Sequence, residues 1–352
     1  MEKIRVAIIG CGTIANNAHI PAYLKNENVE IAAFCDIIPE RAQKAVEDYG
    51  CGIAITNYCE ILTDESIDAV SICTPNDSHK EISVAAMDAG KHVLCEKPAA
   101  KTYEDALVMQ KAAHKTGKIL NIGVCNRFNS AVNTIKELID GGALGELYHV
   151  YISFRAHRSI PGLGGAFTTK AISGGGVLID WGVHFLDIVM YCASDPAPKS
   201  ASAKTFCKLG KDIDSYVFEN MWAGPPVKDG IYDVDDFATG FVRTEGPTIT
   251  FNGAWAQNIN ESEMFIDFLG TESGIRLQYG GDFHLFGVKD GKLITEKPAF
   301  EESNHYENEI NSFIQCILTG KKNAAHIDTA VITSKLMQAI YDSSDKGKEI
   351  EL

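Results

Sequence analysis

The segment Ile4-Arg-Val-Ala-Ile-Ile-Gly-Cys-Gly-Thr-Ile-Ala15 decides the fold of the first third of the chain. It begins as a short apolar run, which is typical of a buried β-strand. It then becomes Gly10-x-Gly12-x-x-Ala15, where one glycine allows a tight turn and the next lets a pyrophosphate approach the backbone. The small alanine lets a helix pack on the strand. Because this motif is weak evidence by itself, its surroundings decide its meaning.

The residues that follow supply the surroundings that a dinucleotide-binding motif requires. A helix is predicted over Ala15–Lys25, and its free N-terminal N–H groups favour a phosphate. The next predicted strand, Glu30–Cys35, ends at Asp36, whose carboxylate can bind an adenosine ribose and would repel a 2′-phosphate. Arg41 on the following helix would favour NADP unless it is a solvated charge. We therefore expect NAD rather than NADP, bound by Gly10, Gly12, Thr13, Ile14 and Asp36.

Short apolar runs alternate with amphipathic stretches as far as about residue 125, a pattern typical of a parallel sheet with crossover helices. Further strands are predicted over Ala69–Cys73, His92–Cys95 and Ile119–Gly123, and further helices over Pro39–Tyr49, Ser78–Ala89 and Tyr103–Lys115. The prediction is an α/β protein whose first domain, residues 1–125, is a doubly wound parallel sheet.

Two loops at the carboxyl ends of these strands carry candidate site residues. Thr74-Pro-Asn76 follows one strand, with His79 opening the next helix, and Glu96-Lys97-Pro98 follows another. Such loops meet at one edge of a parallel sheet, where ligands bind. Thr74 and Asn76 equally suit turn and N-cap roles. Lys97 is either a surface charge or a cation beside a cofactor.

A second informative segment, Gly174–Cys192, is apolar almost all round, as expected of a core helix. At helical spacing, Asp180, His184, Asp187 and Tyr191 fall on one polar stripe. Polar groups in a core need partners. The stripe is therefore either satisfied inside the protein or lines a wet cleft.

The composition indicates the class of protein and disfavours two kinds of partner. The 352 residues are 45% hydrophobic and 22% charged, which is typical of a globular protein of about two domains. A formal charge of −15 disfavours nucleic acid or an anionic membrane as partner. The ten cysteines show no metal-ligand spacing and the N-terminus shows no signal peptide. We expect a cytoplasmic protein without a bound metal.

Beyond Arg127 the apolar residues alternate with period two, which indicates a largely antiparallel sheet with one covered face. Strands are predicted over Tyr148–Phe154, Phe237–Val242, Thr248–Trp255 and Met264–Leu269, and helices near Ser130–Asp140, Tyr306–Leu318 and Asp328–Ser343. The second predicted domain, residues 126–352, is thus an α/β domain with a large open sheet, and its C-terminal helices are free to pack back on the first. The long connections Ala156–Ser173 and Cys207–Val234 suit lids or binding loops.

Five motifs occur in a specific order: Gly10-x-Gly12-x-x-Ala15, Cys73-Thr-Pro-Asn-x-x-His79, Glu96-Lys97-Pro98, Gly123-x-x-Asn126-Arg127-Phe128 and Gly174-Gly-Gly-x-x-x-Asp180-x-Gly182-x-His184. In this set the chain resembles, over essentially its whole length, the glucose–fructose oxidoreductase and inositol dehydrogenase family (Gfo/Idh/MocA). The resemblance implies a Rossmann domain, a C-terminal α/β domain with an open sheet, and NAD(P)-dependent redox chemistry on sugars or polyols.

The resemblance also implies roles for individual residues. Lys97, Asp180 and His184 match the catalytic lysine, aspartate and histidine of the family, whereas Thr74, Asn76, His79, Glu96 and Asn126 match positions near the cofactor. For the substrate side we expect contributions from Arg127, Arg155, His157, Arg158 and Trp181. Each basic residue also suits a solvated patch, and a tryptophan, whether Trp181 or Trp222, is more commonly buried than stacked on a sugar.

The expected reaction is the oxidation of a secondary alcohol. Histidine, with an ordinary pKa of about 6.5, suits His184 as the base. Asp180 would orient the imidazole, and Lys97 would stabilise developing alkoxide charge. The substrate predicted first is a ring hydroxyl of a sugar or glycoside, such as C3 of a glucoside. Inositol is the alternative substrate, and a non-catalytic NAD(P)-binding sensor is the alternative class. The resemblance further implies a homo-oligomer, commonly a tetramer.

Overall fold

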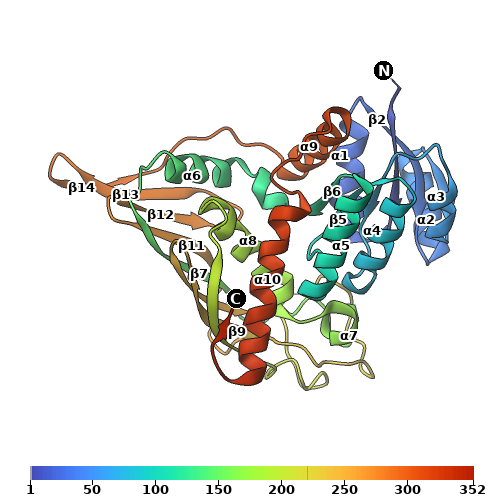
Figure 1. The fold of residues 1–352 in the computed structure, drawn as a ribbon. Helices are drawn as coiled ribbons and strands as arrows, with labels where there is room; N and C mark the ends of the chain where they lie inside the picture. Colours follow the sequence, from blue (N-terminus) through green and yellow to red (C-terminus); the bar gives the residue numbers. More distant parts are fainter. Residues whose placement is uncertain (1, 220) are drawn as a thin grey trace. The chain divides into compact units, whose positions relative to one another are not determined.

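In a computed structural model, which describes residues 2–219 and 221–352, the chain divides into two compact units (Figure 1). Unit 1 comprises Met1–Asn129 and Ser303–Val331, and unit 2 comprises Ser130–Glu302 and Ile332–Leu352. The first crossing lies close to the boundary predicted near residue 125. The chain then returns to unit 1 for helix α9 (His305–Thr319) and the start of helix α10 (Ile327–Lys346).

Unit 1 is built on a six-stranded sheet in the order β3-β2-β1-β4-β5-β6, and every pair in it is parallel. Its strands are β1 (Ile4–Ile9), β2 (Val29–Cys35), β3 (Ile53–Ile55), β4 (Ala69–Ile72), β5 (His92–Glu96) and β6 (Leu120–Gly123). The predicted doubly wound parallel sheet is confirmed. The short strand β3 was not predicted from the sequence.

Helices cover both faces of this sheet (Figure 1). Besides α9 and α10, they are η1 (Ala15–His19), α1 (Ile20–Lys25), α2 (Pro39–Tyr49), α3 (Tyr58–Thr63), η2 (Asn76–Ser78), α4 (His79–Asp88), α5 (Tyr103–Thr116) and η3 (Cys125–Phe128). Apolar residues of α3, α4 and α5 form one core, and those of α1, α2 and α9 form the other. Helices α2 and α5 end at Gly50 and Gly117, which adopt the left-handed conformation that a helix C-terminus favours.

The open edge of the first sheet is covered by a late part of the chain. The segment between α9 and α10 runs beside β6, where the Ile122 N–H donates to the Ala325 carbonyl oxygen over 2.9 Å and Asn121 bridges His326. Ile310 and Phe313 of α9 are buried in the core of the same unit. Unit 1 therefore needs residues from both ends of the chain.

Unit 2 contains a nine-stranded sheet in the order β14-β13-β12-β11-β7-β10-β9-β8-β15. The strands are β7 (Leu147–Arg155), β8 (Pro198–Phe206), β9 (Phe237–Thr244), β10 (Thr248–Ala254), β11 (Glu263–Gly270), β12 (Ser273–Gln278), β13 (Phe283–Lys289), β14 (Lys292–Glu296) and β15 (Ile350–Glu351). Strands β7 and β10 are parallel, and the other recorded pairs are antiparallel. The predicted large, mostly antiparallel sheet is confirmed.

One face of this second sheet packs against helices. The helices of unit 2 are α6 (Ser130–Asp140), η4 (Ala166–Thr168), α7 (Lys170–Ser173), η5 (Leu178–Gly182), α8 (Val183–Cys192) and the later part of α10. Val150, Ile152 and Phe154 of β7 are buried against them, and the rings of Phe154 and Phe185 lie 5.1 Å apart. The stretch Lys170–Cys192 is long and apolar enough to cross a membrane by those two criteria alone, and most of it is buried in this core.

Candidate functional site

The glycine motif after β1 forms a tight, open turn in unit 1. Gly10 has a φ of 93°, and a Cβ there would lie 2.6 Å from the Cys73 carbonyl oxygen, so only glycine fits. A Cβ on Gly12 would meet no atom within 4 Å. The side-chain amide of Asn16 donates to the carbonyl oxygens of Cys11 and Gly12 over 2.9 and 2.8 Å, which fixes the turn. The space over Gly12 is where a pyrophosphate would approach.

Asp36 directly follows β2, and hydrogen bonds hold its carboxylate in place. One oxygen accepts from the backbone N–H of Cys11 and the other from that of Ile38, each over 2.9 Å. Asp36 is 7% exposed, whereas Ile37 beside it is 89% exposed. Arg41 is exposed on α2. A fixed carboxylate beside an uncovered apolar side chain fits the adenosine end of a dinucleotide.

The two loops at the carboxyl ends of β4 and β5 are tied together by His79. Its Nδ1 lies 2.8 Å from the carbonyl oxygen of Pro98, and its Nε2 lies 2.9 Å from that of Thr74. His79 is fully buried, so it links the loops and does not face solvent. Burial lowers the pKa of His79 against the opposing effect of these carbonyl groups. The Thr74 hydroxyl also accepts from Ser78 over 2.7 Å, and Asn76 is half-buried in the short helix η2.

Lys97 follows β5 directly, and the residue before it is anchored in the core. The carboxylate of Glu96 binds the ring of His19 over 2.9 Å with one oxygen and accepts from the Lys97 backbone N–H over 3.0 Å with the other. Lys97 is half-buried and its peptide bond to Pro98 is cis. Neither His19 nor its contact with Glu96 was predicted from the sequence.

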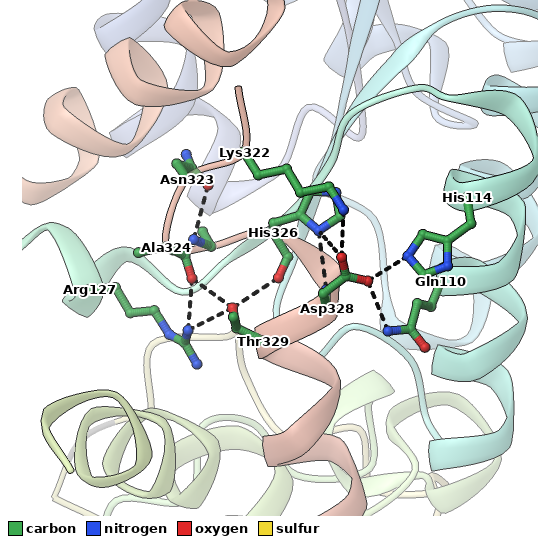
Figure 2. A network of polar contacts seen from close by, with 10 residues as sticks. Gln110, His114, Arg127, Lys322, Asn323, Ala324, His326, Asp328 and Thr329 are labelled. Carbon is green, nitrogen blue, oxygen red and sulfur yellow. Dashed lines mark hydrogen bonds and ion pairs between the residues drawn. The ribbon is translucent and has the colours of Figure 1, made fainter. Parts of the chain in front are cut away.

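Asn126 and Arg127 lie in the short helix η3 and are both buried in unit 1. Figure 2 shows the Arg127 guanidinium beside the segment that precedes α10. It donates to the carbonyl oxygen of Ala324 over 2.7 Å and to the hydroxyl of Thr329 over 2.9 Å. In the same network Asp328 binds Gln110, His114 and Lys322. These contacts give Arg127 a structural role, and its predicted contact with substrate stays a prediction.

The Gly174-Gly-Gly segment of unit 2 is held by a buried aspartate. Asp235 accepts from the backbone N–H groups of Gly176 and Leu178 over 2.8 and 3.0 Å, and from the Tyr341 hydroxyl over 2.9 Å. Burial raises the pKa of Asp235, and these hydrogen bonds oppose that rise. Asp235 therefore satisfies N–H groups that the start of the helix leaves without helical partners.

Close packing explains why this segment is glycine. A Cβ on Gly175 would lie 2.1 Å from the Tyr341 hydroxyl oxygen, and a Cβ on Gly176 would lie 1.9 Å from the Asp235 carbonyl oxygen. The backbone of the helix start is thereby pressed against Asp235 and α10. The predicted site residues Asp180 and His184 therefore follow a segment that is closely packed against its neighbours.

A Gly176→Ala substitution is expected to lower the free energy of unfolding by about 1–3 kcal/mol, because the added methyl group forces the backbone apart. Gly165→Ala is the matched control, since a Cβ there meets no atom within 4 Å. It should change stability by less than about 0.5 kcal/mol. Urea unfolding of both variants measures the difference, and equal stability of the two would contradict this account of the packing.

The polar stripe predicted along Gly174–Cys192 divides into two parts. Asp180 lies in the π-helical segment η5 and His184 one turn later in α8, and both are half-buried. Asp187 is buried and accepts from the Thr333 hydroxyl over 3.0 Å, and the Tyr191 hydroxyl donates to the Asn133 side chain over 2.7 Å. The later half of the stripe therefore bonds within the protein. A π-helical turn at the earlier half is a frequent feature of functional sites.

The predicted basic cluster is engaged by neighbours within unit 2. Arg155 pairs with Glu263, and the ring of His157 lies 2.9 Å from the Glu219 carboxylate. Arg158 donates to the carbonyl oxygen of Gln257 over 2.5 Å. All three side chains remain partly exposed, as does Trp181. Their contacts would orient them, and their role toward substrate stays a prediction.

The two long connections lie against each other. The Ala223 N–H donates to the Pro161 carbonyl over 2.8 Å, and the Val227 N–H donates to the Leu163 carbonyl over 2.9 Å. The Trp222 ring, which is half exposed, meets the Phe167 ring edge-on at 5.0 Å. The predicted loops are therefore one paired structure rather than two independent lids.

Comparison with known proteins identifies the family. Residues 4–124 match the model of an oxidoreductase family with an NAD-binding Rossmann fold, and residues 132–276 match the GFO/IDH/MocA C-terminal domain. The chain belongs to the GFO/IDH/MocA family. The predicted resemblance and the predicted NAD cofactor are thereby confirmed at the level of the family.

Relatives of this GFO/IDH/MocA protein include named sugar oxidoreductases. A D-glucoside 3-dehydrogenase of Escherichia coli is 32% identical over 355 residues, covering 100% of this chain and 98% of the relative. The structure of an aldose-aldose oxidoreductase from Caulobacter crescentus has a TM-score of 0.83 and 25% identity, with 100% of each chain covered. A levoglucosan dehydrogenase solved with NADH and levoglucosan has a TM-score of 0.85 at 21% identity, with 99% of each chain covered, and so supports the fold alone.

Proposed function

We propose that this GFO/IDH/MocA protein is an NAD-dependent dehydrogenase that oxidises a ring secondary hydroxyl of a sugar or glycoside, C3 of a glucoside being the first candidate. The observation that supports this most is the match, over the whole chain, to a D-glucoside 3-dehydrogenase. Asp180 in η5 and His184 in α8, which are both partly exposed, would supply the acid–base groups.

The residues of unit 1 fit NAD. The open space over Gly12 admits a pyrophosphate, and the fixed Asp36 carboxylate suits an unphosphorylated adenosine ribose. When bound, NAD supplies the acceptor for the carbinol hydride. Thr13 and Ile14 at the turn, with Thr74, Asn76, Glu96 and Asn126 at the strand ends, complete the proposed cofactor site. His79 would act there through the two loops that it joins.

Side chains of the protein would carry out the proton transfer and stabilise the developing charge. His184 would remove the hydroxyl proton of the substrate, and Asp180, one turn earlier, would orient the imidazole. The Lys97 ammonium group would bind the reacting oxygen and stabilise the charge that develops on it. Arg127, Arg155, His157, Arg158 and Trp181 are the proposed substrate contacts.

The decisive experiment is NAD reduction by the purified protein against a panel of hexoses, alkyl and aryl glucosides, 1,5-anhydro sugars and inositols. We expect the fastest turnover with a glucoside or a related pyranose, and the oxidised carbon is read by NMR of the product. Turnover with inositols alone would favour the polyol dehydrogenase alternative. Bound NAD without turnover of any compound would favour a cofactor-binding sensor.

An Asp36→Ser variant is expected to shift cofactor preference toward NADP. Removing the carboxylate removes a like-charge repulsion that is worth several kcal/mol, so the ratio of kcat/KM for NADP to that for NAD should rise about 10²-fold. Asp48→Ser, at an exposed position on α2, is the control and should leave the ratio unchanged. An unchanged ratio in Asp36→Ser would show that Asp36 does not set the preference.

We also propose that the protein is a homo-oligomer, with a tetramer favoured. Its subunits would meet through the face of the second sheet that the helices of unit 2 do not cover. The rings of Tyr151 and Phe265 lie there with centroids 5.7 Å apart and are tilted by 52°, and the Arg276 guanidinium lies 4.2 Å from the centre of the Phe265 ring. Light scattering on the purified protein tests the state. A cytoplasmic location is also proposed, and the strongly acidic charge disfavours nucleic acid or an anionic membrane as a partner.

A further inference from the structure

A buried histidine lies between two strands of unit 1. His19 ends the π-helical segment η1, and its Nδ1 lies 2.8 Å from the Ser71 hydroxyl oxygen on β4. Its Nε2 lies 2.9 Å from the carboxylate of Glu96 at the end of β5. His19 and Ser71 are fully buried, and Glu96 is 7% exposed. The ring thus joins the helix after the nucleotide turn to two central strands.

This arrangement has the order of a serine–histidine–carboxylate triad but cannot act as one. A nucleophile must reach a substrate carbonyl, and Ser71 has no exposed surface. The three groups can therefore influence chemistry only through residues that they contact.

The environment of the pair shifts the pKa of each group in the direction that favours its charged form. Burial alone would lower the pKa of His19, but its interactions with Cys73 and Glu96 outweigh burial and raise that pKa well above its ordinary value. Burial alone would raise the pKa of Glu96, but the contact with His19, followed by the effect of Lys97, holds it below its ordinary value. A buried ion pair of this kind is fixed in geometry, because separating the charges leaves each one unpaired in the core.

The fixed carboxylate of Glu96 contacts the backbone of Lys97. The second oxygen of Glu96 accepts from the Lys97 backbone N–H over 3.0 Å. On the other side, the Pro98 carbonyl oxygen lies 2.8 Å from the ring of His79. Lys97 therefore lies between two histidine-anchored residues, and these contacts fix its backbone.

We propose that His19 is a positioning residue for Lys97, acting through the Glu96 carboxylate. The inference rests on the proposed function, in which the Lys97 ammonium group binds the reacting oxygen. A displacement of about 1 Å at a reacting group costs about 10²-fold in rate. Loss of the His19 contact should therefore appear in kcat rather than in the binding of NAD.

Two substitutions at one position separate this role from simple packing. His19→Gln places an amide nitrogen where Nε2 was and retains a donor to Glu96, whereas His19→Asn retains only the contact with Ser71. We expect His19→Asn to lower kcat about 10²-fold and His19→Gln to stay at least about tenfold faster than His19→Asn. The dissociation constant for NADH, from protein fluorescence, should change less than about threefold in both.

A double-mutant cycle tests whether the effect passes through Lys97. Adding His19→Asn to Lys97→Met should cause no further loss of kcat, because the group being positioned is already absent. His92→Asn is the matched control, since His92 lies at the opposite end of β5, where its Nδ1 accepts from the Ile119 N–H over 3.0 Å. It should leave kcat unchanged.

Equal losses in His19→Gln and His19→Asn, or a full loss from His19→Asn in the Lys97→Met background, would overturn the inference. If His19→Asn does not fold, Glu96→Asp tests the same link, because the shorter side chain cannot reach both partners and kcat should fall about tenfold; an unchanged kcat would equally overturn it. Near-normal kcat in Lys97→Met alone would instead refute the proposed role of Lys97.

Discussion

A His184→Ala variant is expected to have a kcat about 10²- to 10⁴-fold lower than the parent protein, because it lacks the group that would take the hydroxyl proton. The measurement is NAD reduction at saturating glucoside, with NADH binding followed by fluorescence. NADH affinity should be retained, since the residues that fit the dinucleotide lie in the other unit. His284→Ala, a half-buried histidine on β13 of the same unit, is the control and should keep its kcat.

The pH dependence provides an independent test of the same role. A histidine base is active when neutral, so kcat/KM of the parent protein should fall as the pH drops through the pKa of the free enzyme's base. In His184→Ala this acid limb should be absent from the residual activity. A variant that keeps near-normal turnover, or the same acid limb, would show that another group is the base.

A Lys97→Met variant is expected to lose about 10²- to 10³-fold in kcat, the range for removing one donor to a developing oxyanion. Methionine keeps much of the length of the side chain but cannot donate or carry charge. The fold-decrease in kcat should exceed the fold-change in KM, because charge on the oxygen develops mainly in the transition state.

Lys115→Met is the control for Lys97→Met, because Lys115 is an exposed lysine of α5 paired with Asp88. Its kcat should be unchanged. A loss confined to KM in Lys97→Met would indicate that Lys97 binds substrate uniformly in the ground and transition states. Lys97 would then not have the proposed electrostatic role.

The fold of unit 1 was largely predictable, because its long apolar strands and amphipathic helices give strong local signals. Helix α2, Pro39–Tyr49, was predicted at its observed ends, since a proline begins it and a glycine follows it. Besides β8, β12, β13 and β15, two short strands with weak signals were missed. Strand β3 has only three residues, and β14, Lys292–Glu296, has four exposed residues out of five, so no alternation marks it.

The candidate site was predictable only where its residues occur in short motifs. Gly10, Gly12 and Asp36 follow from spacing along the chain, and the structure gives each a contact or a space that suits its role. His19 and Glu96 are 77 residues apart, and Asp235 is 59 residues from Gly176. No local pattern marks such pairs, because only the fold brings them together. Arg127 does lie in a short motif, but the motif did not indicate that its guanidinium donates to the carbonyl oxygen of Ala324.

Residues 303–331 complete unit 1 and include the segment that pairs with β6, and this late position in the chain affects the order in which the two units fold in the cell. Domains normally fold from the N-terminus as the chain leaves the ribosome. Here the unit that begins the chain cannot bury Ile310 and Phe313 or pair the edge of β6 until all strands of the second sheet except β15 have been synthesised. A nascent chain that stops before Ser303 would expose an unpaired edge and an apolar face, both of which favour aggregation. The nucleotide-binding unit, although its first strands are translated first, should therefore not be completed until most of the second unit has been synthesised.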